Sequence, residues 1–427
     1  MTRTMSTLNT DLKERIGKAN EEVVRRLVDA RPFLIDMAPA KDVVPGLGGG
    51  RRRVHHSGPP IELSRMCGAQ KGAIVCAALA EGWAQTPAEA FQLLEAGDIE
   101  LGCNHEHQSV GPMAGIVSPN TWVYVVENRT ANNVSFAPEQ QARATFGAYD
   151  DAIAVQERRT SSGIIGPTLR KALKHTGPLD LGELMAQSLH MGDELHTRVT
   201  AAICLLLRAL LPGLVKVGGA EVLKTIEYIN EQSVFFLAVS MAAAKSMSDA
   251  AADVPESTLV TTMCRNGTDF GIRNAGLKGR WFCGPAQKVR GPYMPGFGDD
   301  DAGLDMGDSA VTEVIGVGGC AMSAAPAISS FVGGTAKDLL DSVPKMRQIC
   351  TGRNPKFTIP ILDFEPTPVG IDIRKVVKTG ILPIINTAIA HKDAGHQILG
   401  AGIVHPPLSC FADALRAFGA HYLPPRS

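Results

Sequence analysis

Apolar residues near the start of the chain recur with the period of an amphipathic helix. Over residues 8–30 they stand mostly three, four or seven positions apart, with charged residues between them. Residues 32–37 and 121–127 are short runs rich in branched and aromatic side chains, and they predict buried strands. Residues 68–79 predict a helix of small side chains, and residues 99–102 predict another strand. This alternation of helices and strands is typical of an α/β domain.

The pattern changes near residue 168 and again near residue 255. Between these positions the apolar residues predict one helix after another, at residues 181–189, 193–211, 219–230 and 232–251. After residue 255 the pattern again predicts both helices and strands. Helices are expected at 335–347 and 410–418, and strands at 357–362 and 397–404. We therefore predict a mixed α/β (α+β) fold, in which a helical subdomain is inserted between two α/β domains. The predicted parts are residues 1–167, 168–255 and 256–427.

Composition and charge exclude several classes of protein. The 427 residues carry a formal net charge of -1, which favours neither nucleic acid nor a membrane surface as a partner. The nine cysteines form no CxxC pair, so we expect a reduced cytoplasmic compartment. Residues 1–20 lack the apolar core of a signal peptide. The longest apolar run, residues 201–215, is too short for a membrane span and contains Arg208, so we predict a buried helix.

Glycine, acidic, arginine and amide residues are densest between Met263 and Gly334. Glycines allow the backbone to approach a ligand closely or to adopt positive φ. The Asn266-Gly267 pair is typical of a turn, so we predict that residues 264–273 form a loop. This region is where we expect a binding site for a small molecule.

Arg265, Asp269 and Arg273 recur four residues apart in that region. Two arginines can hold a carboxylate or a phosphate with paired hydrogen bonds. Alternatively, the three residues form an ion network that only ties loops together, because structural ion pairs are common.

Two other groups there could bind an ion. Asp305, Asp308 and Glu313 offer the oxygen ligands that hard cations prefer, so Mg²⁺ is a candidate cofactor. The turn Gly316-Val317-Gly318-Gly319 could bind an anion through backbone N–H groups, or its glycines could serve close packing alone. It lacks the GxGxxG spacing of dinucleotide-binding loops, and the chain has no Walker sequence.

Histidines form a second kind of candidate site. His105 and His107 would share one face of a strand, with Glu106 on the other. A metal would need a third ligand, and nothing in the sequence selects His391 or His405 for that role. Hydrogen bonding to substrate, general acid–base catalysis and an ordinary polar loop are the other interpretations, and we assign no metal ligand.

Two further polar clusters stand beside predicted elements. Asn128 and Arg129 follow the strand at 121–127, and ligands gather at the carboxyl ends of strands in α/β sheets. His190 and His196 flank Asp193-Glu194 among the predicted helices. A solvated helix start explains that segment adequately, although it could also face a site.

Several segments resemble the family of the oxamate carbamoyltransferase subunit AllG. The matching stretches cover nearly the whole chain: residues 111–119, 126–129, 265–273, 307–313, 324–328, 379–381, 386–387, 390–392 and 402–404. The resemblance implies a mixed α/β protein with a helical insert, in agreement with the pattern of apolar residues. It also implies work beside a subunit of the FdrA type, which is similar to acyl-CoA synthetases.

The reaction implied by the resemblance is phosphorolysis of oxalurate to oxamate and carbamoyl phosphate, in anaerobic allantoin use. No catalytic residue is carried over from the family, so the candidates rest on chemistry. We expect catalysis from His105, His107 and Asp269, and substrate binding from Asn128, Arg129, Arg265, Asn266, Arg273, Asp308, Gly318, Gly319 and His391. The alternatives are a non-catalytic subunit that binds a small acid and a stand-alone amide hydrolase. We also expect a homo-oligomer.

Overall fold

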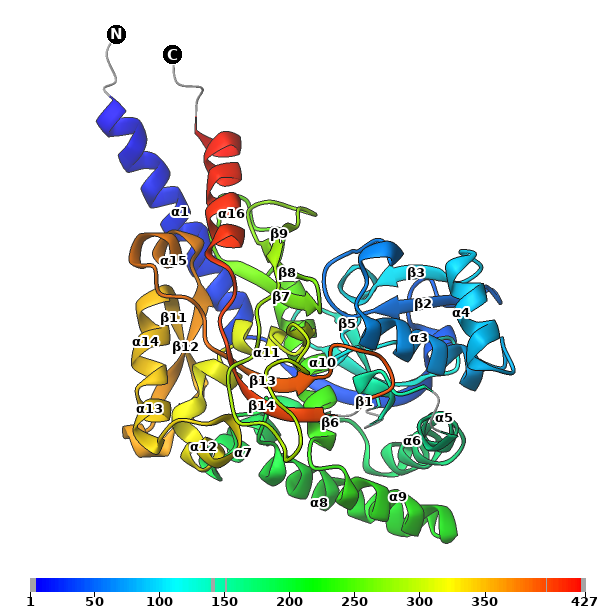
Figure 1. Ribbon diagram of the computed structural model, residues 1–427. Coiled ribbons are helices and arrows are strands. Elements are labelled where there is room, and N and C mark those ends of the chain that lie inside the picture. Colours follow the sequence, from blue (N-terminus) through cyan, green and yellow to red (C-terminus); the bar gives the residue numbers. More distant parts are fainter. Residues whose placement is uncertain (1–4, 140–142, 150–151, 397, 424–427) are drawn as a thin grey trace.

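The computed structural model describes residues 5–139, 143–149, 152–396 and 398–423, and it confirms a mixed α/β fold (Figure 1). The long first helix α1 (Met5–Val28) and the last helix α16 (Leu408–Tyr422) bury side chains in the same core cluster, and Figure 1 shows both described ends of the chain on one side of the molecule. Both helices were expected from their apolar periodicity.

The first sheet has the strand order β5-β4-β1-β6, and all its neighbours are antiparallel. Its strands are β1 (Pro32–Pro39), β4 (Trp122–Asn128), β5 (Asn133–Pro138) and β6 (Leu179–Asp180). Helix α10 (Phe235–Ala250) packs on β4 and β5, and its apolar side chains are buried almost without exception. The predicted strands at 32–37 and 121–127 are thus confirmed and form the centre of this sheet.

A second unit contains the parallel pair β2 (Arg53–His56) and β3 (Glu100–Cys103), with helices α3 (Gly68–Glu81) and α4 (Pro87–Glu95). The Thr86 hydroxyl caps α4 by accepting the Glu89 N–H at 3.2 Å, and proline follows at the first helical position. Both strands end in polar loops, one of which is the short 3-10 helix η2 (Asn104–His107). These loops face the C-terminal part of the chain.

The middle of the chain is helical, as predicted. The helices of the predicted part, residues 168–255, are most of α6 (Gly166–Thr176), then α7 (Leu181–His190), α8 (Thr200–Val217), α9 (Ala220–Glu231) and α10. Helix α5 (Ala152–Thr160) precedes them, in the part predicted as the N-terminal α/β domain. The helix predicted at 193–211 starts only at Thr200, because the Asp193 carboxylate accepts the Ala202 N–H at 2.8 Å and holds residues 193–199 as a buried loop. By length and composition alone α8 is apolar enough to cross a bilayer. Its inner face, including Leu206 and Leu210, lies in the main core, which equally explains an apolar helix.

The second four-stranded sheet has the order β10-β7-β8-β9. Its strands are β7 (Val260–Asn266), β8 (Asp269–Asn274), β9 (Phe282–Pro285) and β10 (Met306–Gly307). The prediction of a loop over residues 264–273 is therefore wrong. The turn at Asn266-Gly267 is real, with Gly267 at φ +79°. It is the tip of a β-hairpin, because the two flanking segments pair as antiparallel strands whose side chains are nearly all buried.

The remaining elements lie outside the two four-stranded sheets. They are α2 (Ala40–Val43), α11 (Val311–Val314), α12 (Ser329–Val332), α13 (Ala336–Leu340), α14 (Ser342–Ile349), α15 (Ile373–Thr379), the hairpin β11 (Cys350–Ile359) and β12 (Glu365–Ile371), and the hairpin β13 (Ile385–Ala390) and β14 (Ile398–Val404). Short 3-10 helices lie at Leu63–Arg65, Ala144–Phe146, Gly318–Cys320, Met322–Ala324, Pro326–Ile328 and Pro360–Leu362, and a π-helix lies at Ser161–Ile165. The largest core joins α1, the first sheet, α8, α10 and β11–β12, so side chains from all three predicted parts share it.

Candidate active site

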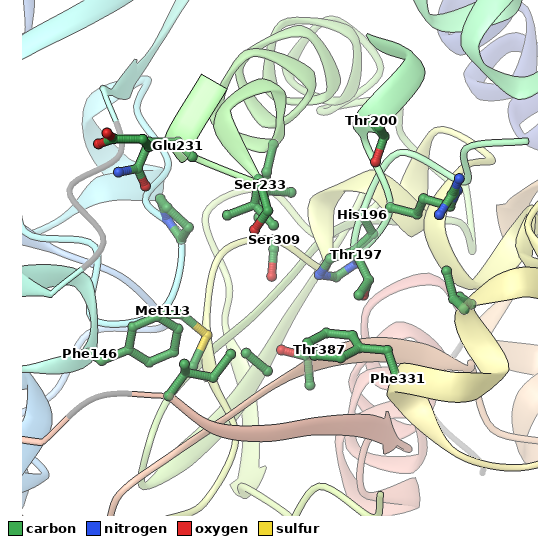
Figure 2. Close-up of a pocket in the computed structure, with 18 of the residues that line it drawn as sticks. Met113, Phe146, His196, Thr197, Thr200, Glu231, Ser233, Ser309, Phe331 and Thr387 are labelled. Carbon is green, nitrogen blue, oxygen red and sulfur yellow. The ribbon is translucent and has the colours of Figure 1, made fainter. Parts of the chain in front are cut away.

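A cavity of about 550 Å³ lies where the three predicted parts meet (Figure 2). Met113 and Phe146 come from the N-terminal part, residues 196–200 and 231–237 from the helical part, and Ser309 and Thr387 from the C-terminal part. Its wall combines apolar side chains with six serines and threonines, two arginines, two glutamates, one histidine and one glutamine. A concave site of this size, lined mostly by apolar groups, is typical of a small-molecule site.

The floor of the cavity is organised by the buried guanidinium of Arg265. Its Nε and Nη2 bind the two oxygens of Asp305 at 2.6 and 2.9 Å. Its remaining N–H groups go to the Gly307 carbonyl at 2.8 Å, the Ser309 hydroxyl at 3.2 Å and the Thr387 hydroxyl at 3.0 Å. All five donors of Arg265 are therefore used within the protein.

The hydrogen bonds of Arg265 also orient the hydroxyls of Ser309 and Thr387. Ser309 and Thr387 each accept from Arg265 through oxygen, and both line the cavity. Their own protons stay available to donate, and the positive charge behind them strengthens that donation. The pair can stabilise an oxyanion or hold an anionic oxygen of a ligand.

His196 lines the same cavity and is oriented by a buried carboxylate. Its Nδ1 lies 2.9 Å from Glu313 Oε1 and 3.2 Å from the Thr312 hydroxyl. Glu313 is held in turn by the Gly319 N–H, which donates to Oε1 at 2.9 Å. No described residue makes a hydrogen bond to His196 Nε2. A carboxylate on Nδ1 sets the tautomer and leaves Nε2 to exchange a proton with a ligand.

The loop that carries His196 is held by Glu194. Its carboxylate accepts the N–H groups of His196, Thr197 and Arg198 at 3.0, 2.5 and 2.5 Å, and its carbonyl accepts the Gly318 N–H at 2.7 Å. Burial raises the pKa of Glu194 to about 6, although nearby His196 and these hydrogen bonds oppose the shift. Burial also raises the pKa of Asp193. The loop is thus a buried part of the site rather than a solvated helix start.

Two arginines supply positive charge to the cavity. Arg198 has a side chain that is 39% exposed and makes one long ion pair, 3.7 Å from Asp193. Arg143 pairs with Glu157 at 3.9 Å and has further interactions. Arg198 is therefore the cation with most freedom to bind a carboxylate or a phosphate.

None of the twelve residues predicted from sequence lines this cavity, but four of them support it from behind. Arg265 holds the two floor hydroxyls, and Asp308 precedes Ser309. Gly318 and Gly319 donate their N–H groups to Glu194 and Glu313. Gly319 therefore positions the Glu313 carboxylate that orients His196, and Gly318 holds the loop of His196 through the Glu194 carbonyl. Neither N–H group is directed at a ligand.

Other predicted residues gather on the far side of β7. His105 is buried, with Nε2 3.4 Å from Asp308 Oδ1, and burial lowers its pKa. Asp308 also accepts the N–H groups of Gly58 at 2.7 Å and Gly111 at 2.8 Å. Cys264 completes this group, and burial raises the pKa of its thiol well above the usual value. All three residues are buried, and none of them lines the cavity.

The rest of the predicted residues have structural partners. The ring of His107 stacks on His55 at 3.8 Å. Asp269 pairs with Arg65 at 2.7 Å, and Asn266 accepts two N–H groups of the hairpin turn. The Arg273 guanidinium lies 5.5 Å from the centre of the Trp281 ring.

Three more lie farther from the cavity. Asn128 accepts the N–H groups of Arg31 and Thr130. Arg129 covers Phe33 at 3.9 Å and pairs with Glu127. His391 stacks on His396 at 3.6 Å, and burial, followed by that neighbouring histidine, lowers its pKa.

The three carboxylates considered for Mg²⁺ do not converge. Asp305 pairs with Arg265, Glu313 pairs with His196, and Asp308 faces His105. Within the described part of the chain, the only group of three such side chains close enough to share an ion is His105, Cys264 and Asp308.

Sequence reasoning passed over the hydroxyls and Arg198, because serine, threonine and arginine are common on any surface. A signal was available, since Ser309 and Thr387 lie inside two of the segments that resemble the family. His196 was noticed only as a histidine beside two acids. Its partner Glu313 stands 117 residues away, and no spacing rule connects them.

Comparisons with known proteins agree with the resemblance. The model of a family described as "Oxamate carbamoyltransferase subunit AllG" matches residues 99–309. The Escherichia coli K12 protein of that name is 39% identical over 409 residues, covering 94% of this chain and 97% of the relative. The uncharacterized protein YahG of the same strain is 43% identical over 418 residues, covering 97% of this chain and 88% of the relative.

A solved structure is also similar. The crystal structure of a conserved protein of unknown function from Enterococcus faecalis V583 matches with a TM-score of 0.92 and 43% identity. The match covers 96% of this chain and 99% of that one. The whole described fold, including the helical middle, is therefore shared with that protein.

Proposed function

The chain belongs to the oxamate carbamoyltransferase subunit AllG family, and from that membership we propose that it is a carbamoyltransferase subunit acting on oxalurate or a similar ureido acid. Phosphate is the second substrate, and the products are oxamate and carbamoyl phosphate. The observation that supports a reacting site on this chain is the cavity, where a carboxylate-oriented histidine, an arginine and two polarised hydroxyls come together.

The reaction makes one bond and breaks one. A phosphate oxygen attacks the ureido carbonyl carbon and forms a tetrahedral centre with negative charge on the former carbonyl oxygen. The bond from that carbon to the inner nitrogen then breaks, and the nitrogen takes a proton to become the amide of oxamate. The site must therefore bind two anions, stabilise an oxyanion and deliver one proton.

Each requirement has a candidate in the cavity. The hydroxyls of Ser309 and Thr387 donate to the oxyanion, with Arg265 behind them. His196 delivers the proton from Nε2, while Glu313 stabilises the charged imidazole. Arg198 holds an anionic group, either the carboxylate of the acid or the phosphate. The substrate-contacting roles thus move from the histidines and arginines selected by sequence to His196, Arg198 and the two hydroxyls.

The test is formation of carbamoyl phosphate from oxalurate and phosphate by the purified chain, with and without an FdrA-type subunit. We expect activity that requires phosphate and falls by about 10²–10⁴ in His196→Gln, the usual loss for a general acid. His190→Gln is the matched control, because His190 is an exposed histidine on α7 that bonds Thr358. Full activity in His196→Gln would contradict the assignment.

Arg198 is tested by substitution with alanine. We expect the KM for oxalurate or for phosphate to rise at least tenfold, since one charge-assisted contact contributes about 1.5–3 kcal/mol. Arg129→Ala serves as the control, because Arg129 lies over Phe33 away from the cavity. Equal effects of the two substitutions would remove Arg198 from the site.

The second candidate is a subunit that binds the acid while an FdrA-type partner supplies the chemistry. The observation that favours it is the name of the Escherichia coli relative, which is a subunit. Under this alternative the chain alone binds oxalurate in calorimetry but never turns it over. A homo-oligomer, a cytoplasmic location and the FdrA-type partner remain part of the proposal, and co-purification with that partner tests the last.

A further inference from the structure

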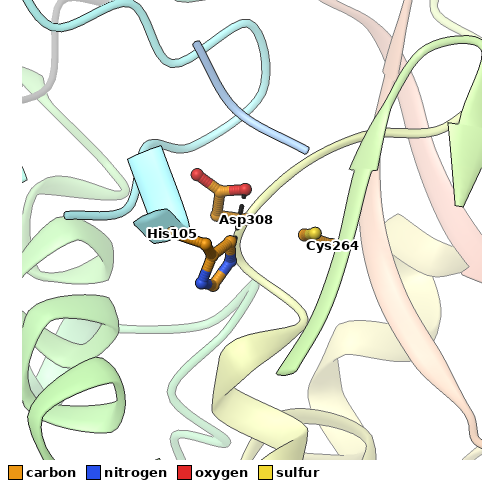
Figure 3. Close-up of side chains that lie close together, drawn as sticks. All are labelled: His105, Cys264 and Asp308. Atoms are coloured by element: carbon orange, nitrogen blue, oxygen red, sulfur yellow. Dashed lines mark ion pairs between the residues drawn. The ribbon is translucent and has the colours of Figure 1, made fainter. Parts of the chain in front are cut away.

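Three side chains that can ligate metal ions meet behind the cavity (Figure 3). His105 comes from η2, Cys264 from the middle of β7, and Asp308 from the turn after β10. One ligand atom from each lies within 4.8 Å of the other two, and all three residues are buried. The fold brings His105 together with two residues that stand more than 150 positions further along the chain.

His105 is the member that ordinary packing explains least. Its imidazole is completely buried, yet neither ring nitrogen has a hydrogen-bond partner among the described residues. A buried polar group without a partner is costly, so such a group calls for a specific explanation. Figure 3 shows the ring directed at Asp308, on the side of β7 where the Cys264 sulfur projects.

The spacing of the ligand atoms suits a metal ion better than a hydrogen bond. His105 Nε2 lies 3.4 Å from Asp308 Oδ1, whereas a charge-assisted hydrogen bond spans about 2.7–2.9 Å. Two nitrogen or oxygen ligands about 2.0–2.1 Å from one tetrahedral Zn²⁺ ion stand about 3.3 Å apart. In a zinc site the sulfur lies about 3.5 Å from the other two ligand atoms. Since the three atoms lie within 4.8 Å of one another, the sulfur needs to move by about 1.3 Å at most.

We propose that His105, Cys264 and Asp308 bind one divalent transition-metal ion of the Zn²⁺ class. Imidazole nitrogen, thiolate sulfur and carboxylate oxygen are the ligands that Zn²⁺ takes in proteins, and a thiolate disfavours Mg²⁺. Binding forms a metal–sulfur bond and releases the thiol proton of Cys264 to solvent. The thiolate and the carboxylate then neutralise the two charges of the ion, and a fourth position remains for a non-protein ligand.

The ion reinforces a junction of segments that already meet at Asp308. Asp308 already binds the N–H groups of Gly58 and Gly111, so an ion on its carboxylate would tie η2 and β7 to the same point. Ser309 and Met113, next to these segments, line the cavity. The ion therefore has a positioning role one residue away from the proposed active site. The proposal does not depend on carbamoyl transfer.

The first experiment uses the full chain without substrate. Chelator-treated protein is titrated with Co²⁺ as a spectroscopic substitute for Zn²⁺, and metal content after dialysis is measured by mass spectrometry. We expect one equivalent of metal, a near-ultraviolet thiolate-to-cobalt absorption band and a rise in melting temperature with Zn²⁺ but not with Mg²⁺. X-ray absorption of the Zn²⁺ form should show one sulfur at about 2.3 Å and nitrogen or oxygen neighbours at about 2.0 Å.

Cys264→Ser is the decisive variant, and Cys410→Ser is its matched control. Both thiols are fully buried and approach adjacent carbonyls of β8, Gly271 for Cys264 and Phe270 for Cys410. We expect the thiolate-to-cobalt band to vanish in Cys264→Ser and to persist in Cys410→Ser. His105→Gln should weaken Co²⁺ binding at least tenfold.

Two results would overturn the proposal. One is wild-type protein that retains less than a stoichiometric amount of metal and shows no sulfur neighbour in X-ray absorption, a measurement that needs no variant to fold. The other is a thiolate-to-cobalt band that survives Cys264→Ser in folded protein. Either result leaves the proposed carbamoyl transfer untouched, because that assay reports on His196 and Arg198.

Discussion

The two faces of β7 carry neighbouring residues with opposite surroundings. Cys264 points to the closed group with His105 and Asp308, while Arg265 points to the open cavity through Ser309 and Thr387. Asp308 and Ser309 divide in the same way at the turn after β10. Residues adjacent in sequence thus serve two different sites, because successive side chains of a strand point to opposite faces.

The cavity side and the closed side of β7 differ in which hydrogen-bonding groups have partners. Arg265 has every donor engaged with protein, but it leaves two hydroxyl protons free at the cavity. On the closed side, His105 has no hydrogen-bond partner among the described residues and no cavity to face. The free hydroxyl protons beside the cavity fit a ligand from solvent, and the unpartnered imidazole in the sealed group supports the metal ion proposed above.

Removing Arg265 should cause the largest loss on the open side. Arg265→Met leaves Asp305 buried without its partner, and breaking a buried pair of this kind costs about 3–5 kcal/mol. We expect that loss in guanidinium unfolding, together with loss of carbamoyl phosphate formation. Arg129→Met is the control, since its half-exposed pair with Glu127 should cost less than about 1 kcal/mol. Equal stability of the two variants would contradict the central role of Arg265.

The next largest loss of stability is expected on the closed side, from substitution of Gly58. Gly58 has φ +83° and donates its N–H to Asp308. A Cβ there would collide with the Arg265 carbonyl, so Gly58→Ala combines backbone strain with overpacking and should cost about 3 kcal/mol.

Gly296 is the matched control for that substitution. It has φ +93° but open space around the position of a Cβ, so Gly296→Ala should cost only about 1 kcal/mol. Thermal unfolding of both variants measures the difference, and equal melting temperatures would mean that the contact between residues 58 and 265 yields easily.

The pH dependence of protein stability tests the role of Glu194, whose loop lies on the cavity side. Burial raises the pKa of Glu194 from its usual 4.5 to about 6. Between these values the unfolded chain loses the proton while the folded protein keeps it, so stability falls as pH rises and the loss is complete above about 6. The shift corresponds to about 2 kcal/mol.

The measurement is urea unfolding of the wild type and Glu194→Gln across that window. The stability of the wild type relative to the variant should decline by about 2 kcal/mol from the acidic end to neutral pH. Glu183→Gln, at an exposed site on α7, controls for the loss of one carboxylate. A difference that stays constant with pH would show that Glu194 titrates normally.

The smallest effect should come from the charge behind His196. In Glu313→Gln the amide can still accept from Gly319 and bond Thr312, so the shape of the site is kept while the charge is lost. We expect kcat to fall about tenfold, as for other partners that orient a histidine, with little change in melting temperature. Glu127→Gln should leave kcat unchanged. An unaltered kcat in Glu313→Gln would mean that His196 acts without its carboxylate.

Much of the fold could be predicted because its signals are local. The period of the apolar residues in α1, the cap at Thr86 and the strand at β4 each lie within a few positions of sequence. The errors occurred where side-chain hydrogen bonds to the backbone, or burial of both faces of a strand, decide the outcome instead of the apolar period. Residues 193–199 are a loop because buried carboxylates bind their backbone, and residues 264–273 are a hairpin because both of its faces are buried.

The sequence predicted the region of the candidate site, but it did not predict which residues line the cavity. Density of glycine, arginine and acid led to Arg265, Asp308, Gly318 and Gly319, which all support the cavity from outside it. A high density of polar residues marks a region where buried polar groups make hydrogen bonds to one another. The side chains of such groups point into the protein. The polar side chains that face the cavity are more widely spaced in the sequence and are of common types. Local composition therefore does not select them.

The sequence by itself determined the class of fold, most of its helices and strands, and the family. It did so because periodicity, caps and family segments are properties of neighbouring residues. The tertiary structure alone decided that His196 meets Glu313, that Arg265 reaches Thr387 and that His105 meets Cys264. These contacts join residues more than 100 positions apart, and which face of β7 meets a cavity depends on the layers packed against it.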